Sequence, residues 1–249
     1  MRLIARLDIK WPNLIKGVQL EGLRIMGDPA EFAKRYYDQN IDEIIYMDVV
    51  ASLYGRNSLI DLIKKVSKGI FVPMTVGGGI RSVEDARMIL RSGADKIALN
   101  TAAIQRPKLI SELATAFGSQ CVVLSIEAKK QNSGKWMAYT DNGRERSEID
   151  ALEWAKVGAE LGAGEILLTS VDKEGTQKGF DIELTKALSN LVNVPVIASG
   201  GMGNMNHIIE LRAESGVDAV AMASVLHYDK VFIPTLRKFA KKNGLPVRD

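Results

Sequence analysis

Short apolar runs alternate with amphipathic stretches along the chain, and the alternation occurs eight times. The apolar runs have the length of buried strands and lie near residues 3–9, 43–49, 70–76, 96–100, 121–128, 165–170, 194–199 and 218–223. Between them, apolar residues recur at helical spacing near 29–40, 57–68, 82–93, 106–117, 149–162, 181–192, 204–215 and 229–243. The pattern therefore predicts eight strands, each followed by a helix.

The sequence also repeats itself about half the chain apart. Residues 71–79, which end in three glycines, resemble residues 194–201, and residues 93–101 resemble residues 216–224. The repeat matches the third predicted strand with the seventh and the fourth with the eighth. A doubly wound sheet would also alternate strands and helices, but this repeat favours two duplicated half-barrels. We therefore predict a single-domain (β/α)8 TIM barrel over residues 1–249.

Composition excludes several classes of function. The 33 basic and 30 acidic residues leave a net charge of +3, which gives no overall electrostatic signal for nucleic-acid binding. No apolar run approaches the ~20 residues of a membrane span, and no signal-peptide pattern precedes the first strand, so we expect no membrane partner and a cytoplasmic location. With two histidines and one cysteine in no metal-binding spacing, we expect neither a metal nor a cofactor.

Two carboxylates end strands that lie on opposite sides of the predicted barrel. Asp8 ends the first strand and Glu127 ends the fifth, and each is followed two residues later by a lysine. Acids that face each other across a pocket suit one general base and one general acid, so Asp8 and Glu127 are the candidate catalytic residues. Taken singly, each would also fit a solvated strand end. Asp48 and Asp172 are expected at the same rim, as a supporting polar group and a loop anchor.

Paired glycines at equivalent places in the repeat predict two phosphate sites. Glycine lets the backbone approach a ligand, and amides that open onto a helix N-terminus attract phosphate oxygens. The residues assigned to the two sites are Gly78, Gly79, Asn100 and Thr101 in the first half, and Gly200, Gly201, Ala223 and Ser224 in the second. If both sites bind phosphate, the substrate is an elongated small-molecule bisphosphate.

Two connections are longer than a strand–helix link requires. Residues 10–27 follow the first predicted strand and residues 129–147 follow the fifth. Both leave the carboxyl ends of strands, where barrel enzymes place their sites, so we interpret them as candidate lids, with inert insertions as the alternative. Turn-forming residues on either side of 136–139 predict a small hairpin in the second connection.

Charged residues stand at the N-terminal starts of four predicted strands, at the end of the barrel opposite the rim. They are Arg2, Glu43, Lys96 and Glu165. Counting in twos from the rim places Arg2, Lys96 and Glu165 inside the barrel, whereas Glu43 is out of step with Asp48 unless a bulge intervenes. Four inward charges would form a neutral ring of ion pairs at the barrel bottom. The alternative is a set of solvated charges at strand starts.

Seven short motifs connect these features to a known family. They are Leu7–Lys10, Leu14–Gly17, Thr75–Ile80, Asn100–Ala103, Phe117–Gln120, Gly164–Ser170 and Ile197–Gly201. In these motifs, and over essentially its whole length, the chain resembles the cyclase subunit of imidazole glycerol phosphate synthase, the HisF family.

The resemblance implies an ammonia-using lyase of histidine biosynthesis. It implies a glutaminase subunit that docks on the N-terminal face of the barrel as a heterodimer partner, and ammonia that passes the ring of Arg2, Glu43, Lys96 and Glu165. The implied substrate is a ribulosyl aminoimidazole carboxamide ribotide with two phosphates, which is converted to imidazole glycerol phosphate. Asp8 and Glu127 would serve as general acid and base, Lys16 would order the first connection, and Thr169 would join the substrate-binding residues.

Four positions depart from the family pattern. Glu127 stands where the family has aspartate, Glu174 replaces another aspartate, and Ala5–Arg6 replace a Pro-Cys pair. One extra methylene moves a carboxylate by about 1 Å, enough to slow a reaction whose rate depends on geometry. A second hypothesis is therefore a paralogous barrel that conducts ammonia for amidination of a surface-polysaccharide sugar. A third, a phosphate-binding isomerase barrel, leaves the charged ring unexplained.

Overall fold

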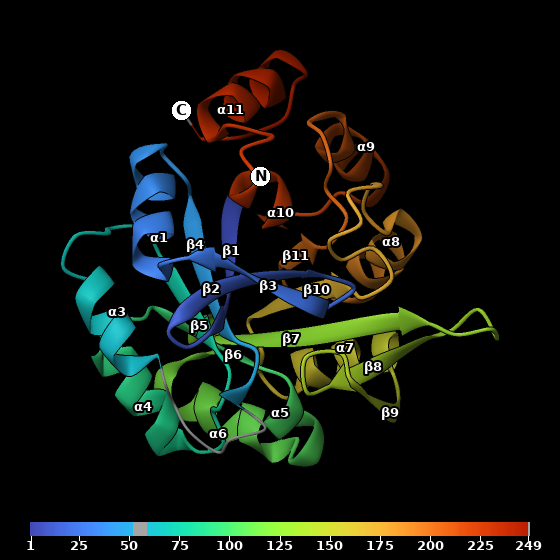
Figure 1. Ribbon diagram of the computed structural model, residues 1–249. Coiled ribbons are helices and arrows are strands. Elements are labelled where there is room, and N and C mark those ends of the chain that lie inside the picture. The colour runs from blue at the N-terminus through green and yellow to red at the C-terminus, as the bar shows by residue number, and fades with distance from the viewer. Residues whose placement is uncertain (52–58, 249) are drawn as a thin grey trace.

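Eight parallel strands close into a barrel in the computed structural model, which describes residues 1–51 and 59–248 (Figure 1). In barrel order the strands are β1 (Arg2–Lys10), β4 (Glu43–Asp48), β5 (Met74–Gly77), β6 (Lys96–Leu99), β7 (Val122–Lys130), β10 (Glu165–Ser170), β11 (Val196–Ser199) and β12 (Ala219–Met222). Parallel pairing of β12 with β1 closes the ring. The predicted TIM barrel is confirmed, whereas the duplication of its halves stays a prediction.

Helices surround the barrel, as Figure 1 shows. The longer ones are α1 (Pro29–Asp38), α3 (Ile60–Val66), α4 (Val83–Arg91), α6 (Lys108–Phe117), α7 (Ala151–Glu160), α8 (Ile182–Leu191), α9 (Asn206–Ser215) and α11 (Ile233–Lys242). Three shorter ones are α5 (Thr101–Gln105), α10 (Ser224–His227) and the 3-10 turn η1 (Ser119–Cys121). Side-chain oxygens of Asp28, Ser82 and Asp181 accept hydrogen bonds from the first turns of α1, α4 and α8, which explains where these helices begin.

Two elements differ in their bounds from the predicted ranges. The third strand was expected over 70–76, but β5 begins only at Met74, because Phe71 projects into solvent with 77% of its surface exposed and Pro73 has no amide to donate. The helix expected over 57–68 is α3, and the part of that prediction at residues 57 and 58 lies outside the described residues.

Apolar side chains form two separate layers. The larger cluster lies between the strands and the helices and includes Leu3, Leu7, Tyr46 and Leu124. The smaller cluster fills the barrel interior and consists of Ile4, Ile15, Ile45, Met47, Val49, Val50, Ala98, Val123, Leu167, Ile197, Ala219 and Ala221. This arrangement follows from alternation along each strand, which sends every second side chain inward. The barrel interior therefore contains an apolar layer.

The two long connections are β-hairpins that extend the barrel strands. β2 (Asn13–Val18) pairs antiparallel with the end of β1, and β3 (Glu21–Gly27) pairs with β2. Likewise β8 (Trp136–Thr140) pairs with the end of β7, and β9 (Glu145–Asp150) pairs with β8. The predicted hairpin near 136–139 is confirmed, whereas the first connection, which was expected to be a loop, is mostly strand. In Figure 1, β2 and β3 lie across the centre of the barrel.

Candidate active site

The two candidate acids occupy matching positions at the rim. Asp8 lies in register with Met47 of β4 on one side and with Ile15 of the first hairpin on the other. Glu127 lies in register with Thr169 of β10 and with Tyr139 of the second hairpin. Each acid therefore sits where a barrel strand meets its hairpin. Both side chains are buried, with 4% of each residue exposed.

The Asp8 carboxylate is surrounded by cations. The Nε of Arg6 donates to its Oδ1 at 2.8 Å, and the Nζ of Lys16 lies 3.5 Å from its Oδ2. Lys16 also forms a buried ion pair with Glu174. Burial alone would raise the pKa of Asp8, but the charges of Arg6 and Lys16 outweigh burial and hold that pKa below its usual value. Asp8 is thus a carboxylate at neutral pH.

Glu127 has the opposite environment. Burial raises the pKa of Glu127 to about 7, against the charge of Arg6 and a hydrogen bond from the backbone of Gly143, while Asp8 and Asp141 add to the increase. Its Oε2 is buried and has no hydrogen-bond partner among the described residues. The pKa values of two carboxyl groups at one rim are therefore shifted apart, an arrangement that suits general acid–base catalysis.

Arg6 is a residue that sequence reasoning left without a role. It is 1% exposed, and its side chain crosses the interior from β1 to the far wall. There its Nη1 donates to Oγ1 of Thr169 at 2.7 Å and to Oγ of Ser199 at 3.2 Å. Thr169 was expected to contact substrate, but its hydroxyl is bound to Arg6. Inward parity with Arg2 and Asp8 was the signal that places Arg6 inside the barrel.

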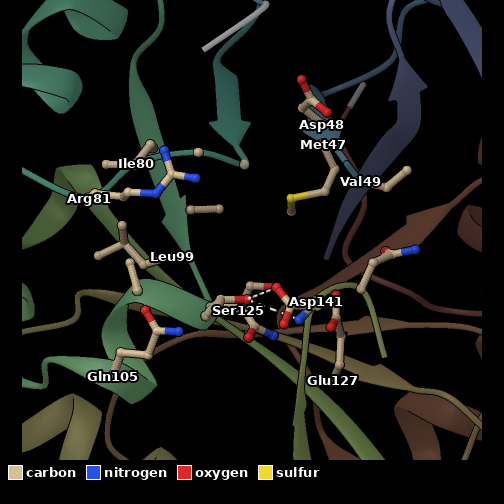
Figure 2. A pocket seen from close by; sticks show the side chains of 17 residues that line it. Met47, Asp48, Val49, Ile80, Arg81, Leu99, Gln105, Ser125, Glu127 and Asp141 are labelled. Carbon is tan, nitrogen blue, oxygen red and sulfur yellow. Dashed lines mark hydrogen bonds between the residues drawn. The ribbon is translucent and has the colours of Figure 1, made fainter. Parts of the chain in front are cut away.

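A cavity of about 360 Å³ opens beside Glu127. The first predicted phosphate site lies in its wall, since Gly78, Gly79, Asn100 and Thr101 all line it together with Asp48. In Figure 2, Arg81 and Gln105 lie across the cavity from Glu127. Both glycines have left-handed backbones, with φ of 99° and 74°. A Cβ on Gly78 would come 2.4 Å from the Asp48 carbonyl oxygen, so a side chain is excluded here.

The tip of the second hairpin forms another wall of this cavity. The Thr101 hydroxyl accepts a hydrogen bond from the Asp141 amide at 3.0 Å, which holds the tip against α5. Next to it, Asn142 is 8% exposed, and neither polar atom of its side-chain amide has a partner among the described residues. Sequence reasoning missed four residues of this cavity, because the elements that bring them together are distant in sequence. They are Arg81, Gln105, Asp141 and Asn142.

The second predicted phosphate site is formed but narrow. Gly200, Gly201, Ala223 and Ser224 line one small cavity of about 10 Å³ together with Glu174 and Ser199. A Cβ on Gly201 would come 2.0 Å from the Gly179 carbonyl oxygen, so only glycine fits. The structure thus brings each predicted set together, on opposite sides of the barrel mouth, but leaves room for a ligand only at the first.

Two contacts hold the loops around the rim. The carboxylate of Asp172 accepts a hydrogen bond from the backbone of Lys130 at 2.8 Å, which ties the loop after β10 to β7. The tips of the two hairpins also meet, since a Cβ on Gly143 would come 2.7 Å from the Leu20 side chain, and Leu20 is 5% exposed. The mouth is therefore spanned by two hairpins in contact.

The four charges at the barrel bottom form a closed ring. Arg2 contacts Glu43 at 2.7 Å and Glu165 at 2.5 Å, and Lys96 contacts the same two carboxylates at 3.3 and 2.8 Å. Glu43 points inward, in step with Ile45 and Met47 of the inner apolar cluster, so Asp48 is the residue that is out of step and no bulge is needed. The two glutamates are nearly covered, whereas the side chains of Arg2 and Lys96 remain 30% and 19% exposed.

Within residues 1–51 and 59–248, no group of three or more His, Cys, Asp or Glu side chains is placed to hold a metal ion. In the same residues, no helix combines the length and apolar character of a membrane span.

Comparisons with known proteins place the chain among proteins of one family. A family described as "Histidine biosynthesis protein" matches residues 2–232. The chain is 63% identical to imidazole glycerol phosphate synthase subunit HisF of Legionella pneumophila over 205 residues, which covers 82% of this chain and 97% of that protein. It is 51% identical to the subunit of the same name from Pyrococcus furiosus over 247 residues, covering 99% and 98%. The subunit from Bacillus cereus is 47% identical with the same coverage.

Proposed function

The chain belongs to the histidine biosynthesis protein family as a HisF-type cyclase subunit of imidazole glycerol phosphate synthase, a lyase, and from this premise we propose its chemistry. In the proposed reaction, ammonia adds to a ribulosyl aminoimidazole carboxamide ribotide, and cleavage and ring closure give two products, imidazole glycerol phosphate and the released aminoimidazole carboxamide ribotide, together with water. Residues 1–249 would act as one domain, because β12 closes on β1. The observation that carries the proposal is the pair of buried rim acids, Asp8 and Glu127, whose pKa values are shifted in opposite directions.

We assign the two phosphates of the substrate to the two glycine sites. One would bind the amides of Gly78 and Gly79 with Asn100 and Thr101, where the cavity has a volume of about 360 Å³. The other would bind at Gly200 and Gly201 with Ala223 and Ser224, which requires that narrow site to widen. Lys16 is paired with Asp8 and Glu174 and would order the first hairpin over the bound ligand.

We assign the charged ring to ammonia entry from a glutaminase on the N-terminal face. Lys96 and Arg2 are the exposed members of the ring, so a docked partner would reach them first. Above the ring, the interior is lined by apolar residues such as Ile4, Val123 and Leu167. Such a lining favours neutral ammonia over ammonium, because an unpaired charge is costly to bury. The exposed ring of Phe71 lies at the same face and suits a protein contact.

Turnover with ammonium tests the reaction without the partner. The purified chain, an ammonium salt and the bisphosphate ribotide would be mixed and loss of the ribotide followed. We expect turnover by the wild type and by the control Arg87→Gln, whose exposed ion pair with Glu84 is not part of the cavity lining. We expect at least a 10²-fold loss in Glu127→Gln, the size of a typical acid–base contribution. Absence of turnover in the wild type that Glu127→Asp does not restore would contradict the cyclase assignment.

One observation favours a second candidate function, ammonia delivery for amidination of a surface-polysaccharide sugar. Arg6 bridges Asp8 to the far wall, at a place where the family pattern has a small cysteine. If that contact prevents the cyclase reaction, the channel would serve another acceptor. This candidate predicts no loss of ribotide, together with glutamine-dependent ammonia transfer to a sugar amidotransferase mixed with the chain and its glutaminase.

A further inference from the structure

Arg6 lies between the apolar interior and the two acids. It follows Ile4 of the inner apolar cluster along β1 and precedes Asp8, and all three side chains point into the barrel. It is among the largest fully buried side chains of the described residues. The charge of a buried guanidinium has to be compensated; the Nε and Nη1 of Arg6 have hydrogen-bond partners, whereas its buried Nη2 has none among the described residues. Its position therefore has to be explained by its contact with Asp8 and by its charge near Glu127.

The guanidinium is held at both ends. Its Nε donates to Asp8 at 2.8 Å, and its Nη1 donates to Thr169 at 2.7 Å and to Ser199 at 3.2 Å. A planar fork whose donors are fixed on three different strands, β1, β10 and β11, cannot turn without breaking a buried hydrogen bond. Thr169 is also the register neighbour of Glu127. One side chain thus connects the strand of the first acid to the neighbour of the second.

We propose that Arg6 is a positioning residue that divides the roles of the two acids. It holds Asp8 in one orientation as a carboxylate that binds without exchanging protons, and it leaves the proton transfers to Glu127. This assignment rests on the cyclase function proposed above and adds to it which acid moves the proton.

The charges around the site support this division. Asp8 is faced by Arg6 from its own strand, Lys16 from β2 and the buried His227 from α10, while Glu174 shares Lys16. Two cations and two carboxylates therefore balance without Glu127. Ionised Glu127 would add a surplus negative charge beside Asp8 and Asp141, with Arg6 as the compensating group. Its pKa of about 7 agrees with a carboxyl group that gains and loses a proton easily at neutral pH.

The proton balance of ammonia addition closes with Glu127 alone. As ammonia forms the carbon–nitrogen bond, the carbonyl π bond breaks and its oxygen takes the proton from Glu127. The nitrogen then carries a positive charge, which the fixed Asp8 carboxylate stabilises. Loss of one proton from that nitrogen to ionised Glu127 gives the neutral carbinolamine and restores the starting acid. Asp8 remains a carboxylate throughout.

Carboxyl titration by NMR tests the division directly. With side-chain carboxyl ¹³C labels on Asp and Glu, we expect Glu127 of the wild type to titrate near pH 7 while Asp8 stays ionised over that transition. In Arg6→Gln we expect both pKa values to rise, because the guanidinium lowers both. Arg87→Gln removes an exposed guanidinium and should leave both titrations unchanged.

Kinetics separate orientation from charge. In Arg6→Lys the positive charge remains but the fork to Thr169 and Ser199 is lost. We expect the two carboxyl titrations to stay close to those of the wild type, while kcat with ammonium falls by about 10²-fold, the cost of a misplaced catalytic group. The KM for the ribotide should change less than kcat, because Arg6 contacts Asp8, Thr169 and Ser199 but none of the glycine-site residues assigned to the phosphates.

The titration and kinetic results each support or overturn the proposed role of Arg6. Parallel titration of Asp8 and Glu127 in the wild type overturns the division even if Arg6→Gln does not fold, and so do unchanged titrations in a folded Arg6→Gln. Wild-type kcat in Arg6→Lys overturns the orienting role. If the wild type does not consume the ribotide, the proposed reaction fails by itself, and the titrations still show whether Arg6 sets the two acids apart.

Discussion

The contact between the last helix and the first strand offers a sharp test of how the barrel is held closed. Asp42 precedes β4 and is 8% exposed. Its Oδ2 accepts from the Leu3 amide at 2.7 Å, and its Oδ1 lies 2.8 Å from Nη2 of Arg237 on α11 and 3.2 Å from Nε of Arg248. One carboxylate therefore joins β1, β4, α11 and the C-terminal segment. We expect Asp42→Ala to be strongly destabilising.

The expected magnitude follows from burial of the pair. Breaking a buried ion pair from one side costs about 3–5 kcal/mol, because the remaining charge is left uncompensated. Arg237 would keep hydrogen bonds to the carbonyl oxygens of Asn40 and Arg248 at 2.7 and 3.1 Å, so the lower end applies. We expect the free energy of unfolding to fall by about 3 kcal/mol. With a urea m-value of about 3 kcal/mol/M, the midpoint falls by about 1 M.

Urea unfolding followed by far-UV circular dichroism measures this change. The matched control is Asp38→Ala, which breaks the pair with Lys34 on α1, where both side chains are 55% exposed. An exposed pair contributes under about 1 kcal/mol. Asp42→Asn keeps an oxygen for the Leu3 amide and should lie between the two. A loss in Asp42→Ala no larger than in Asp38→Ala would refute the reasoning.

Three further predictions concern the site. Gly78→Ala should lower the free energy of unfolding by about 1–3 kcal/mol and weaken ribotide binding, because the φ of Gly78 is 99° and an added Cβ would meet the Asp48 carbonyl oxygen. The control Gly134→Ala, with open space around the added Cβ, should keep ribotide binding. Calorimetric titration with the ribotide measures both, and equal binding by the two variants would contradict the prediction. Lys96→Glu should reduce glutamine-dependent turnover far more than ammonium-dependent turnover, measured side by side with the glutaminase, and equal losses would count against a gate. The pKa of Glu127 is about 7 in the folded protein against 4.5 for an ordinary glutamate, so the folded state holds a proton that the unfolded state has lost. The free energy of unfolding of the wild type should therefore fall by about 3 kcal/mol as pH rises from 4.5 to 7. Urea titrations of Glu127→Gln should lack this fall, and identical pH profiles for the two proteins would contradict the shift.

The barrel and the two acids could be predicted because both leave local traces in the sequence. Alternating apolar runs mark buried strands, and the position of Asp8 and Glu127 at the ends of such runs marks the rim. The ring at the bottom was also readable from parity for three of its four members. In each case the relevant information lies within a few residues of the group concerned.

The contacts of Arg6 and Asp42 could not be predicted, because their partners are distant in sequence. Arg6 binds Thr169 and Ser199, which are 163 and 193 residues away. Asp42 binds Arg237 at a separation of 195 residues. The strands of the first hairpin were not predicted for another reason. β3 is mostly exposed, so its sequence does not show the alternation of apolar and polar residues that marks a strand with one buried face.

The meeting of the two hairpin tips has a consequence for how ligands leave. Leu20 of the first hairpin packs at Gly143 of the second, and the backbone of Gly143 is hydrogen-bonded to Glu127. At their bases, the hairpins are laddered to the strands at Asp8 and Glu127 themselves. Neither hairpin can swing away without disturbing an acid or its neighbour's tip. We therefore expect the two hairpins to open together, so that the two products leave at a shared rate.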